Sequence, residues 1–212
     1  MKISPPQMPA QLEDATLDEL LDGDLEDVIL ADIDATNCLV SGLNISGVKF
    51  EKILLTAAQL ERVSAKDLVA QQTDFSATHL ANGAINRASF SNCRMTGVDF
   101  SKTNLHDVIF SGCKLDMANL RFADLRRVKF VDCTFAETDF LGAILYDVTF
   151  ESCTLEKTVF DQAKCKQVDL RSSELIEISG WTSLKGATID SVQLTIAAPY
   201  LANELGLTVR NT

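Results

Sequence analysis

The sequence contains little that would direct the chain into or across a membrane. It has no run of about 18 apolar residues, the length that a membrane-spanning helix requires. The first residues, MKISPPQMPA, lack the apolar segment of a secretion signal. We therefore expect a cytoplasmic protein whose six cysteines remain thiols, because that compartment is reducing.

Basic residues are also scarce, and the charges are unevenly distributed. There are 19 Lys and Arg against 30 Asp and Glu, which gives a net charge of −11. Ten of the acids lie in residues 1–34 beside the single base Lys2, whereas the rest of the chain holds 20 acids and 18 bases. Because phosphate contacts require a basic surface, this composition argues against direct binding of nucleic acid.

Groups that are typical of catalytic sites are few. The chain has only two histidines, His79 and His106, and neither is matched by spacing to a serine or cysteine nucleophile. The phosphate-binding patterns G-x-x-x-x-G-K-[ST] and G-x-G-x-x-G do not occur. We therefore expect no enzymatic activity, no cofactor and no metal site.

The sequence does contain a five-residue repeat. Every fifth residue from Leu20 to Leu175 is apolar, over 32 consecutive positions. A period of five fits neither a free helix nor an alternating strand, and so indicates a repeat architecture. Ten of the eleven phenylalanines occupy this position: Phe50, Phe75, Phe90, Phe100, Phe110, Phe130, Phe135, Phe140, Phe150 and Phe160.

A second apolar position lies two residues before each of these, and residues 118–122 and 123–127 follow the pattern A-(D/N)-L-x-x. This pattern resembles the pentapeptide-repeat family over roughly residues 20 to 195. The resemblance implies an all-β solenoid, a right-handed quadrilateral β-helix of pentapeptide repeats. A 20-residue period, as from Phe110 to Phe130 to Phe150, independently supports four pentapeptides per coil and hence about 8–9 coils.

The two ends depart from the repeat, and we divide the chain into an acidic N-terminal extension or cap (1–19), the β-helix (20–190) and a C-terminal helical cap (191–212). Residues 12–23 fit either a short helix, with a capping box from Thr16 to Glu19 and a stop at Gly23, or a degenerate first coil. The repeat loses its phase at Gly180, where we expect Trp181 to fill the junction. Residues 192–206 are predicted to form a helix and residues 207–209 a short edge strand.

This C-terminal end resembles the dimerising end of the gyrase-protecting pentapeptide-repeat proteins, which join tail to tail. The resemblance implies a homodimer through an apolar surface of the helix and strand. Its candidate residues are Leu194, Ala198, Leu201, Leu205 and Leu207. The alternative is a monomeric cap, because an open solenoid end must be covered in either case.

The 20-residue period also predicts columns of stacked side chains. Cys93, Cys113, Cys133 and Cys153 share an inward column. We expect them to pack as small apolar residues, because collinear thiols cannot form a tetrahedral metal site. An outward column alternates in sign through Asp67, Arg87, Asp107, Arg127 and Asp147. Its members are expected to pair along the rod, with a recognition stripe as the alternative.

Phe122 is the one phenylalanine outside the core positions, and in a four-sided coil Leu141, Arg121, Arg126 and Tyr146 surround it. Aromatic and arginine side chains together are typical of interface centres. We therefore expect a non-catalytic, rigid interaction module that binds an unidentified protein through this cluster or through its acidic N-terminal tip.

The resemblance implies an alternative function, a DNA mimic that binds a type II topoisomerase (DNA gyrase) and modulates it or protects it from quinolone-type inhibitors. Duplex DNA carries about one negative charge per 1.7 Å. The nearly neutral body of this chain departs from such mimicry.

Overall fold

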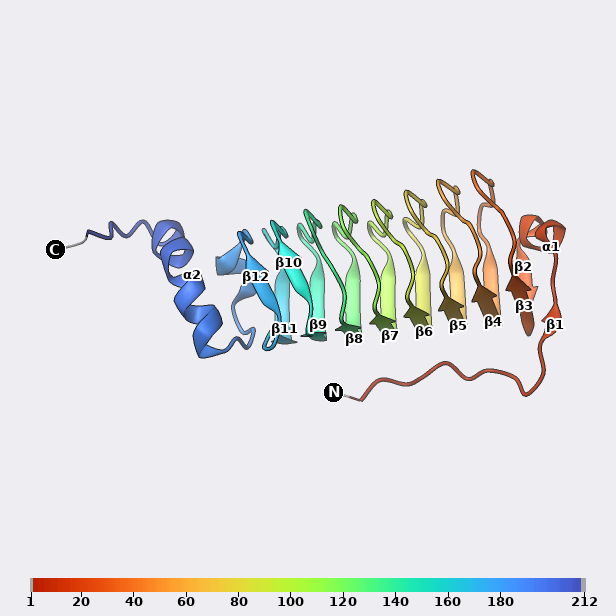
Figure 1. Cartoon of the computed structure of the whole chain (residues 1–212), viewed down its shortest axis with the longest axis horizontal. Helices are drawn as coiled ribbons and strands as arrows, with labels where there is room; N and C mark the ends of the chain where they lie inside the picture. The colour runs from red at the N-terminus through yellow and green to blue at the C-terminus, as the bar shows by residue number, and fades with distance from the viewer. Residues whose placement is uncertain (1, 211–212) are drawn as a thin grey trace.

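The computed structural model describes residues 2–210 and forms a β-solenoid of about eight turns (Figure 1). The strands pair in parallel with partners 20 residues away, as Val108 with Val128 and Phe110 with Phe130. Four pentapeptides therefore make one coil, as the sequence predicts. The elements are β1 (Glu13–Asp14), α1 (Leu17–Asp22), β2 (Asp24–Glu26), β3 (Val28–Ala31), β4 (Asn44–Glu51), β5 (Ser64–Gln71), β6 (Ala84–Ser91), β7 (Asn104–Ser111), β8 (Asp124–Val131), β9 (Ile144–Glu151), β10 (Thr154–Glu156), β11 (Lys164–Asp169), β12 (Glu174–Ile176), the 3₁₀ helix η1 (Trp181–Leu184) and α2 (Ser191–Glu204).

The corners of the coil lie at residues with left-handed backbone, one in every pentapeptide. In the sixth coil these are Phe122, Arg127, Asp132 and Glu137, with φ of 56°, 52°, 52° and 56°. This conformation is unfavourable for residues other than glycine. Each corner is held by a hydrogen bond to the next coil; the Phe122 N–H donates to the Leu141 carbonyl at 2.9 Å, for example. The regular ladder thus offsets a local strain that repeats every five residues.

The core contains the residues that the five-residue period selects. Of the apolar positions from Leu20 to Leu175, all are buried except Cys165, which is half-buried. The phenylalanine rings stack, with centroids 4.9 Å apart between Phe110 and Phe130 and 5.0 Å apart between Phe130 and Phe150. Such offset aromatic contacts add to the hydrophobic stabilisation of the core.

The inward cysteine column forms as predicted. Cys93, Cys113, Cys133 and Cys153 are buried and carry free thiols. Their Sγ atoms lie against backbone carbonyls, as Cys113 does against Phe90 at 3.4 Å. Buried threonines use the same kind of bond; Thr138 Oγ1 donates to the Leu115 carbonyl at 2.7 Å. The thiols therefore occupy core space as small side chains with a weak donor.

The first coil is closed by a helix, so the structure decides between the two alternatives for residues 12–23. Thr16 and Glu19 form the capping box of α1, and Gly23 ends the helix with φ of 89°. Leu20 is buried beneath the coil, and β1 pairs with β3. Before β1, the N-terminal segment runs back along the rod beneath the strands (Figure 1).

The C-terminal end is closed by η1 and α2, and Trp181 is buried at the junction as predicted. The edge strand predicted for residues 207–209 does not form, and this prediction is wrong. Leu207 and Val209 alternate with polar residues as a strand would, but a strand requires a neighbouring edge, and this segment has none. No helix within residues 2–210 is long and apolar enough to span a membrane.

Candidate functional site

Large apolar side chains that remain exposed are concentrated at the C-terminal end of the rod. They include Ile176, Val192, Leu194, Ile196, Tyr200, Leu205, Leu207 and Val209, with exposed fractions from 40% to 74%. The body of the rod exposes only four such residues beyond α1, among them Met117 and Phe122. Contiguous apolar surface of this kind marks interaction sites, whereas scattered single residues do not. By this criterion the C-terminal end is a candidate surface, and the surroundings of Phe122 are a second candidate on their aromatic and arginine composition.

The C-terminal surface consists of the outer faces of α2 and the residues that follow it. Of the predicted dimerisation residues, Leu201 packs partly against the core, and Leu194, Ala198, Leu205 and Leu207 are exposed. Ala197 is fully buried, which shows that its side of α2 packs against the last coil. The helix therefore covers the solenoid with one narrow stripe and leaves the rest of its apolar surface open.

Sequence reasoning missed a second stripe on α2. Val192, Ile196 and Tyr200 follow one another at intervals of four, and they line a groove of about 570 Å³ together with Ile176 of β12. A four-residue interval places side chains on one helix face, so the spacing itself was a usable signal. On another side of α2, a groove of about 360 Å³ is lined by Ala198, Pro199, Ala202, Asn203, Leu207 and Val209.

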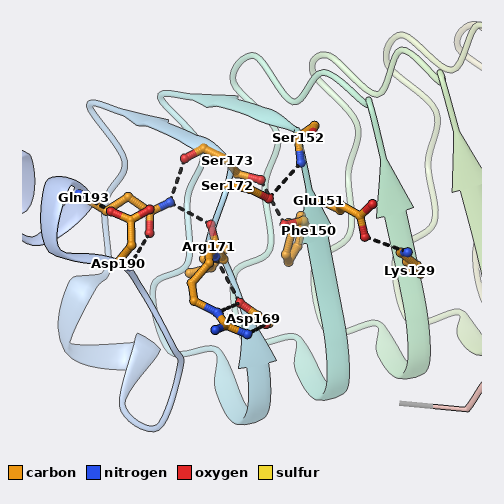
Figure 2. A network of polar contacts seen from close by, with 11 residues as sticks. Lys129, Phe150, Glu151, Ser152, Asp169, Arg171, Ser172, Ser173, Asp190 and Gln193 are labelled. Atoms are coloured by element: carbon orange, nitrogen blue, oxygen red, sulfur yellow. Dashed lines mark hydrogen bonds and ion pairs between the residues drawn. The ribbon is translucent and has the colours of Figure 1, made fainter.

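Gln193 attaches α2 to the solenoid (Figure 2). Its Nε2 donates to the carbonyls of Leu170 and Ser173, both at 2.7 Å, and the side chain is buried. The Leu170 bond spans 23 residues, the same step as the Ser173 Oγ bond to Phe150 one coil earlier. A helical side chain thus takes the position that the next coil would fill.

Both ends of α2 are anchored. At its start, Asp190 and Gln193 form a capping box, a pattern visible in the sequence as Asp-x-x-Gln. At its end, the Glu204 carboxylate accepts hydrogen bonds from the backbone N–H groups of Trp181 and Thr182, at 3.1 and 2.9 Å. The apolar surface is therefore presented on a fixed element.

Of the residues predicted to surround Phe122, Leu141 is bonded to it from the adjacent coil, and Arg121 precedes it in the chain. Arg126 and Tyr146 are register partners in β8 and β9, and the Phe122 N–H is bonded to Leu141. The ring lies on Gly142; a Cβ added there would be 2.6 Å from Phe122 Cε1. Phe122 is 54% exposed, so one face of the ring is supported and the other is open.

The arginines of this cluster are paired within the protein. Arg121 Nε donates to Asp139 at 2.7 Å, and Arg126 Nε donates to Asp124 at 2.9 Å. The hydrogen bond to Asp124 raises the pKa of Arg126. Lys166 lies over the Tyr146 ring at 5.0 Å. The cluster is thus an aromatic and apolar centre with charges held in local pairs at its edge.

The outward column of alternating sign forms two separate ion pairs. Arg87 Nε donates to Asp67 Oδ1 at 2.7 Å, and Arg127 Nε donates to Asp107 Oδ1 at 2.8 Å. These arginine hydrogen bonds hold the pKa of Asp67 and Asp107 below their ordinary range. Within residues 2–210, no ion pair joins Arg87 to Asp107, so pairing along the column is not continuous.

The two histidines have different surroundings. His79 Nδ1 lies 3.7 Å from an Asp99 carboxylate oxygen on the rod surface. Burial lowers the pKa of His106, whose Nε2 has no hydrogen-bond partner in the described part of the chain. Over the same residues, no group of three His, Cys, Asp or Glu side chains is placed to hold a metal ion.

Comparison with known proteins agrees with this geometry. Residues 83–160 match the family model described as "Pentapeptide repeat region". The solved structure of QnrB1, a plasmid-mediated fluoroquinolone resistance protein, is 19% identical and covers 88% of this chain and 90% of its own, with a TM-score of 0.64. At that identity the likeness shows a common fold alone.

HetL, a pentapeptide repeat protein involved in heterocyst differentiation regulation in the cyanobacterium Nostoc, is also 19% identical. It covers 79% of this chain and 90% of its own, with a TM-score of 0.35, which is too low to support a comparison of folds. No curated protein sequence matches the chain significantly. The repeat and the parallel coils agree with the family match, which assigns pentapeptide repeats to residues 83–160 of the chain.

Proposed function

We propose that this protein is a non-catalytic, rigid protein-binding module of the cytoplasm. The observation that carries the proposal is the exposed apolar surface at the C-terminal end, where residues of α2 and the following segment are between 41% and 74% exposed. Water-exposed apolar area of this extent is usually covered by another protein. The six free thiols support a reducing compartment.

The partner of the C-terminal surface in this proposal is a second copy of the chain. A two-fold contact brings the same patch of both copies together, so an apolar surface can cover itself. Leu194, Leu205 and Leu207 supply the apolar area, and the exposed groove beside Ala198 and Val209 supplies a complementary depression. The pairing would leave the sides of both rods free for a different protein.

That different protein binds, in our proposal, at the Phe122 cluster. The Phe122 ring has one face packed on the chain and the other exposed, and the arginines assigned to this cluster form ion pairs with aspartates. Aromatic and arginine side chains are typical of interface centres, where a few anchoring residues contribute most of the binding energy. The acidic N-terminal tip is the other surface that could contact a partner, but its charge is solvated and would affect the rate of association more than the affinity.

Chemical cross-linking in cells that express the protein would test this surface. Phe122→Ser should abolish a specific cross-linked species. Lys102→Ser is the matched control, because Lys102 occupies the same corner one coil away and is exposed as well. Equal yields from both variants, or equal loss, would show that Phe122 does not anchor a partner.

A second candidate function is binding to a type II topoisomerase. It is favoured by the common fold with QnrB1, a fluoroquinolone resistance protein. It is opposed by charge, because the acids and bases beyond residue 34 nearly balance and several arginines pair with aspartates on the coils. A DNA-supercoiling assay with gyrase, with and without a quinolone, decides the matter; no effect at micromolar protein would eliminate this function.

A further inference from the structure

The N-terminal segment makes specific contacts with one corner of the rod. The Gln7 N–H donates to Asp67 Oδ1 at 2.8 Å, and the Ser4 N–H donates to Asp107 Oδ1 at 3.2 Å. These contacts join residues 60 and 103 positions apart in the sequence. Figure 1 shows the segment running back beneath the strands, against the direction in which the coils advance. We call residues 2–11 the strap.

The corner that the strap follows carries a carboxylate on every second coil. In chain order it consists of Asp27, Gly47, Asp67, Arg87, Asp107, Arg127 and Asp147. Arg87 and Arg127 each donate two hydrogen bonds to the aspartate one coil before them. The arginines thereby fix the carboxylates, which still accept a backbone N–H from the strap. Both carboxylates are kept ionised, since the arginines lower their pKa.

The spacing of the carboxylates matches the geometry of a polyproline II segment. Pro5, Pro6 and Pro9 fix φ near −65°, and the residues before them are confined to extended backbone. In this conformation the three-residue step from Ser4 to Gln7 covers about 9.3 Å. Two coils advance by about 9.6 Å. Because aspartates alternate with arginines along the corner column, the carboxylates recur at nearly the same interval as every third N–H group of an extended, proline-containing backbone.

Side chains of the strap and the corner agree with this register. Ser4 and Gln7, whose N–H groups bond to the corner, have exposed side chains. Ile3, Pro6, Met8 and Pro9 are half-buried. At Gly47, an added Cβ would lie 3.3 Å from Pro9 Cδ and would collide with the Asp27 carboxylate. The glycine thus leaves the space that the proline fills.

We propose that this corner is a binding track for an extended, proline-containing peptide segment, and that the strap occupies it as a tethered ligand. Recognition rests on backbone N–H groups at positions i and i+3 and on prolines that preset the conformation, so it requires few particular side chains. A segment of the same chemistry from another protein binds the track only when it displaces the strap. Because a short tether gives an effective concentration of about millimolar, the strap is a strong competitor.

The test uses the full chain with Ser4→Pro and Gln7→Pro together. Proline removes the donated N–H at each position while it keeps the polyproline II backbone, and neither side chain is buried. Release of the strap in this double variant is measured by 15N relaxation of the Met8 amide, which should change from the slow motion of a docked segment to the fast motion of a free one. The variant Ala10→Pro is the matched control, because Ala10 is exposed and its N–H has no acceptor within the described residues. It should leave the Met8 amide as rigid as in the wild-type chain.

Binding in trans is then measured by fluorescence anisotropy with a labelled peptide of sequence KISPPQMPAQ. The double variant should bind this peptide at least about tenfold more tightly than the wild-type chain does, because its track is vacated. Adding Asp67→Ala and Asp107→Ala should reduce the affinity at least about tenfold, since each charge-assisted hydrogen bond contributes that much. Asp147→Ala, in the same column and without a donor within residues 2–210, should have no such effect.

Two results would overturn the proposal. One is peptide affinity that is equal in the wild-type chain and the double variant. The other is an affinity that does not change when the two aspartates are removed. Either would mean that the strap is an ordinary terminal arm and that the corner is not a binding track.

Discussion

Truncation of Phe130 to alanine tests the packing on which the whole rod depends. The Phe130 side chain is fully buried, with ring centroids 4.9 Å from Phe110, 5.0 Å from Phe150 and 5.0 Å from Phe135. Loss of such a ring removes transfer free energy and leaves a cavity in a close-packed interior. The free energy of unfolding should therefore fall by about 3–5 kcal/mol. Phe130→Asp should prevent folding, because it buries a charge among aromatic rings.

Phe122→Ala supplies the comparison, because it changes the same residue type in the neighbouring coil face. Phe122 is 54% exposed, so only about half of the 1.5–3 kcal/mol gained by complete burial is at stake. We expect a loss of about 1 kcal/mol. Urea denaturation followed by circular dichroism measures both variants, at one fixed protein concentration since self-association would add to the apparent stability. Equal losses for the two variants would refute the inward assignment of the phenylalanine column.

Two further predictions concern the cap and the ion pairs. Gln193→Ala leaves the Ser173 carbonyl without a donor, whereas the Leu170 carbonyl still accepts the Ser173 N–H at 3.3 Å, and the loss should cost about 1–3 kcal/mol locally. Hydrogen exchange should then accelerate in α2 and remain slow in residues 83–160, and uniform acceleration would contradict a local cap. Asp67 and Asp107 have lowered pKa values in the folded state, so their contribution to stability is complete above their ordinary pKa of about 4 and is lost as the pH falls through the folded value. Urea midpoints at pH 7 and pH 3 should differ less in the double variant Asp67→Asn, Asp107→Asn than in the wild type, and an unchanged difference would contradict this assignment.

The interior was predictable from the sequence because its period is unambiguous. A residue such as Phe130 appears at the same phase as 31 other apolar residues, and one face of a coil repeats after 20 residues. Stacking of the rings and burial of the cysteine column follow directly. The packing of the coils depends only on neighbours in the repeat, so local information is sufficient.

The strap could not be predicted, because its contacts use backbone N–H groups. Ser4 and Gln7 bond to Asp107 and Asp67 through their backbone N–H groups and not through their side chains. The residue types at positions 4 and 7 therefore do not indicate these two contacts. The alternating signs of the corner column were visible, and they suggested either pairing or recognition. The structure contains the arginine–aspartate ion pairs of this column. The strap adds hydrogen bonds to the same aspartates, which the spacing of residues within the repeat could not indicate.

The ends were predicted in part, since local signals determine a helix but not its docking. The capping residues allowed a helix at α1 beside the alternative of a degenerate coil, and the apolar spacing predicted α2. Insertion of Gln193 into the last coil depends on where the chain returns after the phase break at Gly180, which the sequence does not specify. The strand predicted at residues 207–209 failed for a related reason, because a strand is stable only beside another edge.

The mass of the protein in solution tests most directly whether the C-terminal apolar surface is an interface. Light scattering at micromolar concentration should give twice the 23.2 kDa of one chain. Leu207→Lys, which places a charge on a side chain that is 62% exposed in one chain, should return the mass to that of a single chain without loss of the coil spectrum. A mass of 23.2 kDa for the wild-type protein would contradict the proposed pairing.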